Sequence, residues 1–173
     1  MNIATVKKFD IANGPGVRVS LFVSGCRHHC KNCFNKEAWD FNYGIPMTKE
    51  IEKEILDACK PAHITGLSLL GGEPFEKENR AGLISLTKKF RELYPEKNIW
   101  CYTGFLLDEE LLKSKDSDIL ELLQNIDVLV DGRFVDELKS ASLLFRGSSN
   151  QRIIDVAETL KKGEVVLLPG KWE

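Results

Sequence analysis

Short runs of β-branched and aliphatic residues alternate along the chain with segments whose apolar residues recur at helical spacing. Several of the runs are almost continuously apolar, which is typical of strands covered on both faces. The strands predicted in this way cover residues 17–23, 66–70, 98–102, 128–131, 152–156 and 165–168. The pattern therefore predicts an α/β protein.

Helices are predicted between these runs. Apolar residues recur every four positions from Thr48, which can serve as the N-cap of a helix that ends near residue 59. Three more helices follow from the same periodicity or from capping-box spacing. They cover residues 79–93, 118–124 and 155–163.

The alternation of strands and helices implies parallel strands joined by right-handed crossovers. A complete eight-fold β/α barrel usually needs ~250 residues, so a chain of 173 residues is too short for one. The predicted fold is α/β, with either an incomplete, open parallel β/α barrel or a curved parallel sheet. No repeat or Pro/Gly/Ser-rich linker divides the chain, so residues 1–173 are expected to form a single domain.

Composition narrows the classes of function. Hydrophobic residues make up 43% of the chain, charged residues 29%, and the formal net charge is −2, so no nucleic-acid partner is expected. No apolar run approaches the ~18 residues of a membrane span, so no membrane association is expected. The first residues lack the basic-then-apolar order of a signal peptide, and we expect a cytoplasmic protein.

Three of the five cysteines lie within eight residues, in a C-x₃-C-x₂-C pattern formed by Cys26, Cys30 and Cys33. In a cytosolic chain such crowding indicates metal binding or redox chemistry rather than a disulfide scaffold. A [4Fe–4S] cube is usually held by four thiolates, so three cysteines leave one iron able to accept a small molecule. Cys59 falls on a helix face and Cys101 in a strand, and both are expected to be structural.

Other interpretations of the three cysteines remain open on spacing alone. Zinc could be bound with His28 or His29 as a fourth ligand, although both lie inside the C-x₃-C loop, where neither easily reaches the fourth tetrahedral corner. A redox dithiol of Cys30 and Cys33 would leave Cys26 unexplained. Buried structural cysteines are a third possibility, although the charged and polar flanks make a poor core.

The segments that suggest chemistry all follow predicted strands. They are residues 25–33, 71–74, 103–104 and 131–132. Because ligands of parallel sheets bind at the carboxyl ends of the strands, these four segments are expected to meet at one rim.

The cysteine pattern and the later Gly71-Gly72-Glu73-Pro74 together resemble the radical S-adenosylmethionine (SAM) superfamily, whose two motifs follow the first and second barrel strands. The resemblance implies an open barrel with a [4Fe–4S] cluster and SAM as cofactors. The implied cluster ligands and catalytic residues are Cys26, Cys30 and Cys33. The implied SAM contacts are Asn32, Cys33, Phe34, Gly71, Gly72, Glu73 and Asp131, of which Phe34 could instead be a core aromatic and Asp131 a partner contact.

Two further segments resemble activating proteins within that superfamily, and the second of them resembles the activating proteins of anaerobic ribonucleotide reductase. Residues 13–18 (NGPGVR) are similar to a DGPG-x-R opening of glycyl-radical-enzyme activases, with Asn13 where that pattern has Asp. This exchange removes a charge, so an ion-binding or partner role at that position is in doubt. Residues 146–152 (RGSSNQR) resemble a segment of the reductase-activating branch.

This resemblance implies an oxidoreductase that passes one electron into SAM and forms methionine and a 5′-deoxyadenosyl radical. The radical would take a hydrogen atom from a glycine of the reductase large subunit, and flavodoxin or ferredoxin would supply the electron. Arg27 and Lys31 could raise the cluster potential or be solvated charges. The alternatives are activation of another glycyl radical enzyme, such as pyruvate formate-lyase, and a non-catalytic zinc or iron–sulfur interaction module.

Overall fold

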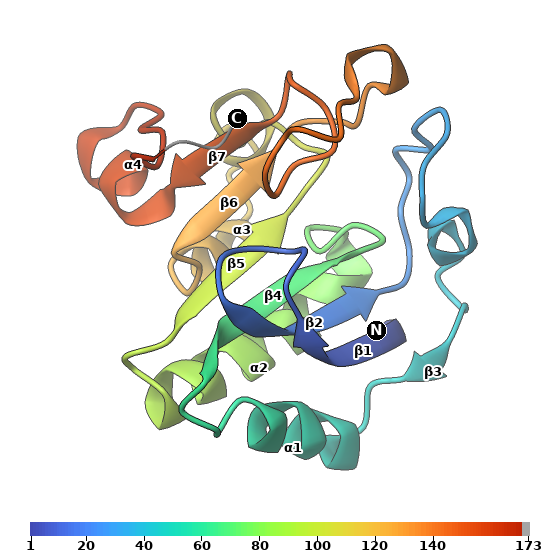
Figure 1. The fold of residues 1–173 in the computed structure, drawn as a ribbon, viewed down its shortest axis with the longest axis vertical. Coiled ribbons are helices and arrows are strands. Elements are labelled where there is room, and N and C mark those ends of the chain that lie inside the picture. The colour runs from blue at the N-terminus through green and yellow to red at the C-terminus, as the bar shows by residue number, and fades with distance from the viewer. Residues whose placement is uncertain (171–173) are drawn as a thin grey trace.

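Seven strands form one sheet in the computed structural model, which describes residues 1–170 (Figure 1). Their order across the sheet is β3-β1-β2-β4-β5-β6-β7. The strands are β1 (Asn2–Asp10), β2 (Val17–Val23), β3 (Ile45–Pro46), β4 (Ile64–Gly71), β5 (Asn98–Tyr102), β6 (Val128–Asp131) and β7 (Arg152–Asp155). The predicted α/β class is confirmed.

The four central strands β2, β4, β5 and β6 are parallel, whereas β1, β3 and β7 pair antiparallel with their neighbours. The prediction of parallel strands is therefore right for the centre of the sheet and wrong for β7. Residues 132–151, which join β6 to β7, contain one short 3-10 helix, η3 (Asp136–Leu138), and no crossover α-helix. Without such a crossover, the chain returns antiparallel to β6.

The four predicted helices are all present. They are α1 (Lys49–Ala58), α2 (Lys77–Leu93), α3 (Ser117–Leu123) and α4 (Val156–Lys162). Thr48 caps α1 as predicted, because its hydroxyl accepts from the Ile51 N–H at 3.3 Å. Asp155 caps α4, and Gly163 ends that helix in the left-handed conformation. The 3-10 helix η1 (Lys36–Trp39) and the π-helix η2 (Leu107–Leu111) were not predicted.

One predicted strand is absent from the structure, and two strands of the sheet were not predicted. Residues 165–168 form no strand, and their only ladder contact among the described residues is an isolated bridge from Leu167 to Ile154. The edge strands β1 and β3 were not predicted. In β1, exposed and half-buried residues outnumber buried ones, so its sequence lacks the apolar run on which the other predictions rested.

Side chains alternate between the two faces of the sheet, as the two-residue period of a strand requires. In β5, Ile99 and Cys101 point into the main core, where α1, α2 and α3 cover one face of the sheet (Figure 1). Trp100 points to the opposite face and packs with Val130 of β6. The core therefore lies under the helices, and the second face is left to line the interior in which the functional site is found.

Arg18 is a fully buried guanidinium on that second face of β2. Its Nε donates to the Ser68 hydroxyl of β4 at 2.7 Å, and Ser68 in turn donates to the Asn13 carbonyl at 2.6 Å. Burial lowers the pKa of Arg18 to about 10. The NGPGVR segment is thus held against the sheet by its own arginine, and the Asn13 side chain donates to the Asp10 carboxylate at 2.6 Å.

Within residues 1–170, none of the helices combines the length and apolar composition that a membrane crossing requires. The single domain predicted for residues 1–173 includes three residues, 171–173, that lie outside the described part of the chain.

Candidate functional site

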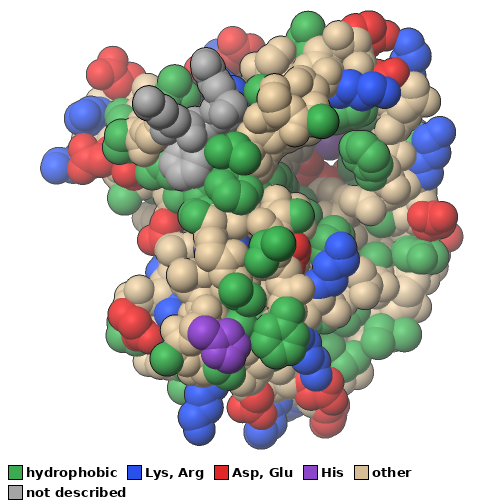
Figure 2. Space-filling model, viewed as in Figure 1, with side chains coloured by type: hydrophobic (Ala, Val, Ile, Leu, Met, Phe, Trp, Pro, Cys, Tyr) green, Lys and Arg blue, Asp and Glu red, His purple; other side chains and the backbone are tan. Residues whose placement is uncertain are grey.

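A cavity of about 390 Å³ opens at the carboxyl ends of the parallel strands. Figure 2 shows this face of the molecule hollowed, with hydrophobic side chains gathered around the hollow. All four predicted rim segments contribute to its lining, together with residues from other loops. The residues of these segments that line the cavity are Cys26, His28, Cys30, Cys33, Gly71, Gly72, Glu73, Thr103, Gly104 and Gly132. The expected meeting of these segments at one rim is confirmed.

The cysteine loop, which we define as residues 24–35, follows β2 directly. Cys26 is buried at its start, whereas Cys30 and Cys33 are partly exposed, and none of the three is in a disulfide. Positive φ angles of 50° at His29 and 56° at Asn32 turn the chain sharply between the cysteines. All three thiols therefore lie on one short, tightly turned loop beside the cavity.

The donor set fits a metal cluster, although the thiols are not gathered around one point. Among the described residues, no group of three His, Cys, Asp or Glu side chains stands in a metal-binding arrangement. Burial raises the pKa of Cys26 to about 12, and burial also raises the pKa of Cys30. Since metal ligation requires thiolates, binding would release protons and bring the three thiols together.

Gly71 and Gly72 bring the end of β4 against the start of the cysteine loop. A Cβ atom at Gly71 would lie 2.7 Å from the backbone N and O of Val23, and one at Gly72 would lie 2.6 Å from the carbonyl of Gly25. Two backbone hydrogen bonds, Gly72 N to Val23 O (2.7 Å) and Glu73 N to Gly25 O (2.8 Å), join the two loops. The glycines are therefore required for the two sequence motifs to pack together.

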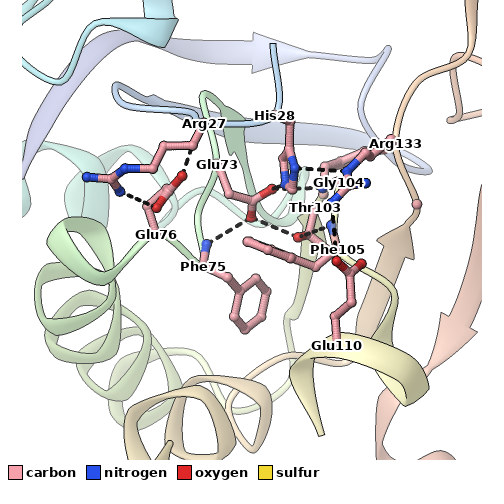
Figure 3. Close-up of polar contacts among 12 residues, drawn as sticks. Arg27, His28, Glu73, Phe75, Glu76, Thr103, Gly104, Phe105, Glu110 and Arg133 are labelled. Atoms are coloured by element: carbon pink, nitrogen blue, oxygen red, sulfur yellow. Dashed lines mark hydrogen bonds and ion pairs between the residues drawn. The ribbon is translucent and has the colours of Figure 1, made fainter. Parts of the chain in front are cut away.

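Glu73 has a buried carboxylate that accepts four hydrogen bonds (Figure 3). Oε1 accepts from the Phe75 N–H (2.9 Å) and the Thr103 hydroxyl (2.8 Å). Oε2 accepts from the Gly104 N–H (2.8 Å) and lies 2.9 Å from His28 Nε2. A carboxylate offers about four acceptor positions, so this group is fully used within the protein.

His28 joins the cysteine loop to the far side of the cavity. Arg133 Nε donates to His28 Nδ1 at 3.1 Å, and Arg133 also pairs with Glu110 at 3.2 Å (Figure 3). Because a guanidinium only donates, Nδ1 is an acceptor, which places the ring proton on Nε2, where it is donated to Glu73. A Cβ at Gly104 would lie 2.4 Å from the His28 ring, so glycine is required there for the histidine to dock.

Asp131 is fully buried at the end of β6, and it does not line the cavity. Arg152 of β7 binds it through two contacts, Nε to Oδ1 at 2.9 Å and Nη2 to Oδ2 at 2.5 Å. Oδ2 also accepts from the Leu107 N–H at 2.8 Å. These contacts indicate a structural role, joining β6, β7 and η2, whereas the predicted SAM or partner contact remains a prediction.

The other predicted residues around the cysteines lie nearer the surface. Phe34 lines the cavity but is 86% exposed, so the alternative of a core aromatic is wrong. Asn32 is exposed and donates to Asp136 at 2.7 Å. Arg27 pairs with Glu78 and Glu76, and Lys31 pairs with Glu137. Because carboxylates neutralise both cations, a role for them in raising a cluster potential loses support.

Several residues of the site were not assigned roles from the sequence. The sequence suggests a role for His28 only as a zinc ligand, and it suggests no individual role for Thr103. Arg133 and Glu76 were not singled out for a role in the site. Each of these four residues forms a hydrogen bond to a residue of another loop. No spacing within the sequence predicts such pairs. Cys59 and Cys101 lie in the main core, as expected.

The chain is similar in sequence to known iron–sulfur and reductase-activating proteins. The family model of a 4Fe-4S single cluster domain matches residues 12–154, a span that includes the cysteine loop, residues 71–74 and β6. The anaerobic ribonucleoside-triphosphate reductase-activating protein of Escherichia coli K12 is 44% identical over 153 residues, which cover 87% of this chain and 96% of the relative. The chain belongs to this family of reductase-activating proteins.

Other members of the family are similar over the same extent. The reductase-activating protein of Pasteurella multocida is 41% identical over 155 residues, covering 88% of this chain and 96% of its own. That of enterobacteria phage T4 is 37% identical over 153 residues, covering 88% and 93%. Membership of a family with a 4Fe-4S cluster domain explains why three free cysteines lie together on one loop and form no disulfide.

Proposed function

We propose that this chain is a cytoplasmic radical SAM activating enzyme that generates a glycyl radical on the large subunit of anaerobic ribonucleotide reductase. The single observation that carries the proposal is the convergence of the three-cysteine loop and the Gly-Gly-Glu-Pro loop on one cavity at the carboxyl ends of four parallel strands. The sheet would be an open, incomplete β/α barrel of the radical SAM type, whose inner face carries the cavity.

Cys26, Cys30 and Cys33 would hold the [4Fe–4S] cluster. Three thiolates leave one iron free to take a ligand from the cavity, which the same three residues line. When bound, the cluster would supply the electron, received from a donor such as flavodoxin or ferredoxin, for reductive cleavage of SAM. The protein would contribute binding, orientation and exclusion of water.

SAM would bind in the cavity between the two loops. Its volume of about 390 Å³ falls in the range of small-molecule sites, about 300–1,000 Å³. Gly71 and Gly72 leave one wall without side chains, and Cys33 and Phe34 of the cysteine loop would contact the ligand, whereas the neighbouring Asn32 donates to Asp136 and would contact the ligand only after releasing it. Asp131 would act at a distance, by fixing the end of β6.

Glu73 would accept a hydrogen bond from the amino group of SAM. That bond would replace the one that His28 now donates to Glu73. The carboxylate already has four donors, and Phe75 and Gly104 donate from the backbone while Thr103 donates from the end of β5. His28 alone comes from the cysteine loop, so it can be replaced by an ammonium group as that loop closes. An ammonium is the stronger partner for a buried carboxylate than a neutral imidazole.

The reductase would reach the cavity past the β6–β7 loop, which we define as residues 132–151. This loop contacts the cysteine loop through Lys31–Glu137 (2.6 Å), Asn32–Asp136 (2.7 Å) and Arg133–His28 (3.1 Å), and through the Phe34 and Phe134 rings, whose centroids are 6.0 Å apart. Exposed polar pairs of this kind contribute little to stability. Opening this side of the cavity to a glycine-bearing segment would therefore cost little.

The proposal is tested by anaerobic cluster reconstitution, reduction in the presence of SAM, and measurement of 5′-deoxyadenosine. The wild type is expected to release 5′-deoxyadenosine, and Cys30→Ala is expected to release none. Cys59→Ala is the matched control, because it removes a cysteine that lies in the core and not in the loop. Stoichiometric zinc, no four-iron cluster and intact SAM in the wild type would instead support an interaction module.

A further inference from the structure

Glu76, two residues beyond Pro74 of the Gly-Gly-Glu-Pro loop, directly contacts the cysteine loop. Its side chain is only 9% exposed, and it is also the N-cap residue of α2. Oε1 accepts from the backbone N–H of Arg27 at 2.9 Å, and Oε2 accepts from the guanidinium of the same residue at 2.5 Å (Figure 3). One buried carboxylate therefore binds both the main chain and the side chain of the residue that follows Cys26.

The guanidinium of Arg27 is held on a second side by an aromatic ring. Its Cζ lies 4.2 Å from the centroid of Phe41, which is within the range of a cation–π contact. Phe41 also packs on Gly25, where a Cβ would lie 2.3 Å from the ring. Arg27 thus lies between the Phe41 ring and the two carboxylates of Glu76 and Glu78.

These contacts fix the main chain on both sides of Cys26. The N–H of Gly25 donates to the Ala38 carbonyl at 2.8 Å, and that of Cys26 donates to the Trp39 carbonyl at 3.2 Å. The next N–H along the chain is that of Arg27, and Glu76 is its acceptor. Cys26 is also the one buried thiol of the three, so the start of the loop is fixed while Cys30 and Cys33 lie partly exposed.

We propose that Glu76 is a positioning residue for the iron–sulfur cluster, which acts by fixing the backbone at Cys26 so that this thiol is in place before the other two close on the metal. The inference rests on the proposed function, since it assumes that Cys26 is a cluster ligand. The acceptor bond to the Arg27 N–H carries the effect, and the ion pair with the guanidinium adds to it. Glu78, which contacts only the guanidinium, lacks the backbone bond.

The test measures cluster retention in the reconstituted full-length protein. Wild type, Glu76→Ala, Glu76→Gln and Glu78→Gln are reconstituted anaerobically, and iron and sulfide per chain are determined. The rate of iron release to a chelator is then followed by the loss of the cluster absorption. Thermal unfolding of each protein reports separately on global folding.

Glu76→Ala is expected to release iron roughly tenfold faster than the wild type, because the charged hydrogen bond to the Arg27 N–H is lost. Glu76→Gln keeps an acceptor oxygen for that N–H and is expected to recover most of the retention. Glu78→Gln is expected to match the wild type. If Glu76→Ala does not fold, a slower iron release from Glu76→Gln than from a folded Glu76→Leu supports the same conclusion.

Equal rates of iron release from the wild type and Glu76→Ala would overturn the inference. Equally fast iron release from Glu76→Ala and Glu78→Gln would also overturn it, because the loss of one negative charge would then explain the faster release. Both outcomes leave the proposed function intact, because the wild type still holds its cluster. A wild-type protein that binds no cluster would overturn both.

Discussion

Replacing Glu73 by Gln is predicted to destabilise the protein before any cofactor is involved. The buried carboxylate accepts a backbone N–H on each of its oxygens, from Phe75 on Oε1 and from Gly104 on Oε2. Glutamine has one oxygen and one NH₂ group. Whichever way the amide turns, one of the two backbone N–H groups therefore faces another donor.

The size of the destabilisation is set by the two backbone N–H groups, of Phe75 and Gly104, which cannot change their orientation. The Thr103 hydroxyl can rotate, and His28 lies on the cysteine loop, so these donors can adapt to an amide. A buried backbone N–H that loses its acceptor costs about 1–3 kcal/mol. For a chain of this size, a loss of about 2 kcal/mol lowers the melting temperature by roughly 4–8 °C.

Thermal unfolding under anaerobic conditions, without SAM, measures this cost. Glu54→Gln, an exposed position on α1, is the matched control and is expected to change stability by less than about 0.5 kcal/mol. A melting temperature of Glu73→Gln within about 1 °C of the wild type would refute the inference that the carboxylate holds both loops. It also follows that lost activity in a Glu73 variant reports on SAM binding only when the variant is as stable as the wild type.

Three further predictions concern the Arg152 contacts at the sheet edge and the N-cap of α4. Asp131→Asn is expected to lose about 2 kcal/mol or more in urea denaturation, since it weakens the buried pair with Arg152; an unchanged midpoint would argue against this role. Hydrogen bonds from Arg152 hold the pKa of Asp108 below its usual range, so their contribution to stability is full above about pH 5 and is lost as pH falls through the folded-state pKa. The stability difference between wild type and Asp108→Asn should therefore shrink from neutral pH to about pH 3, and a constant difference would contradict the pairing. Asp155→Ala removes the cap that accepts from the Glu158 N–H at 3.0 Å and should cost about 1 kcal/mol by the same denaturation, whereas no loss would show that the cap does not stabilise α4.

The sequence was sufficient for the features that depend on local pattern. Apolar runs located β2, β5 and β6 at their observed bounds, and the cap residues located α1 and α4. The cysteine and Gly-Gly-Glu-Pro motifs were placed at the correct strand ends, because each follows an apolar run directly. From that placement alone, the rim of the sheet could be identified as the site.

The remainder depends on contacts between segments that are far apart in the sequence. The antiparallel direction of β7 could have been inferred, because residues 132–151 contain no amphipathic helix for a crossover. The partner of Asp131 is 21 positions away, and the His28 partner of Glu73 is 45 positions away. No periodicity specifies such pairs, since they follow from how the loops pack once the strands are in register.

Electron paramagnetic resonance on the reductase itself tests the proposed function most directly. The reconstituted protein is reduced and incubated anaerobically with SAM and the large subunit of the cognate anaerobic ribonucleotide reductase. We predict a glycyl radical signal on the large subunit with the wild type and none with Cys30→Ala. Cleavage of SAM without a radical on the reductase would contradict the assigned partner, and absence of both would contradict the proposed function.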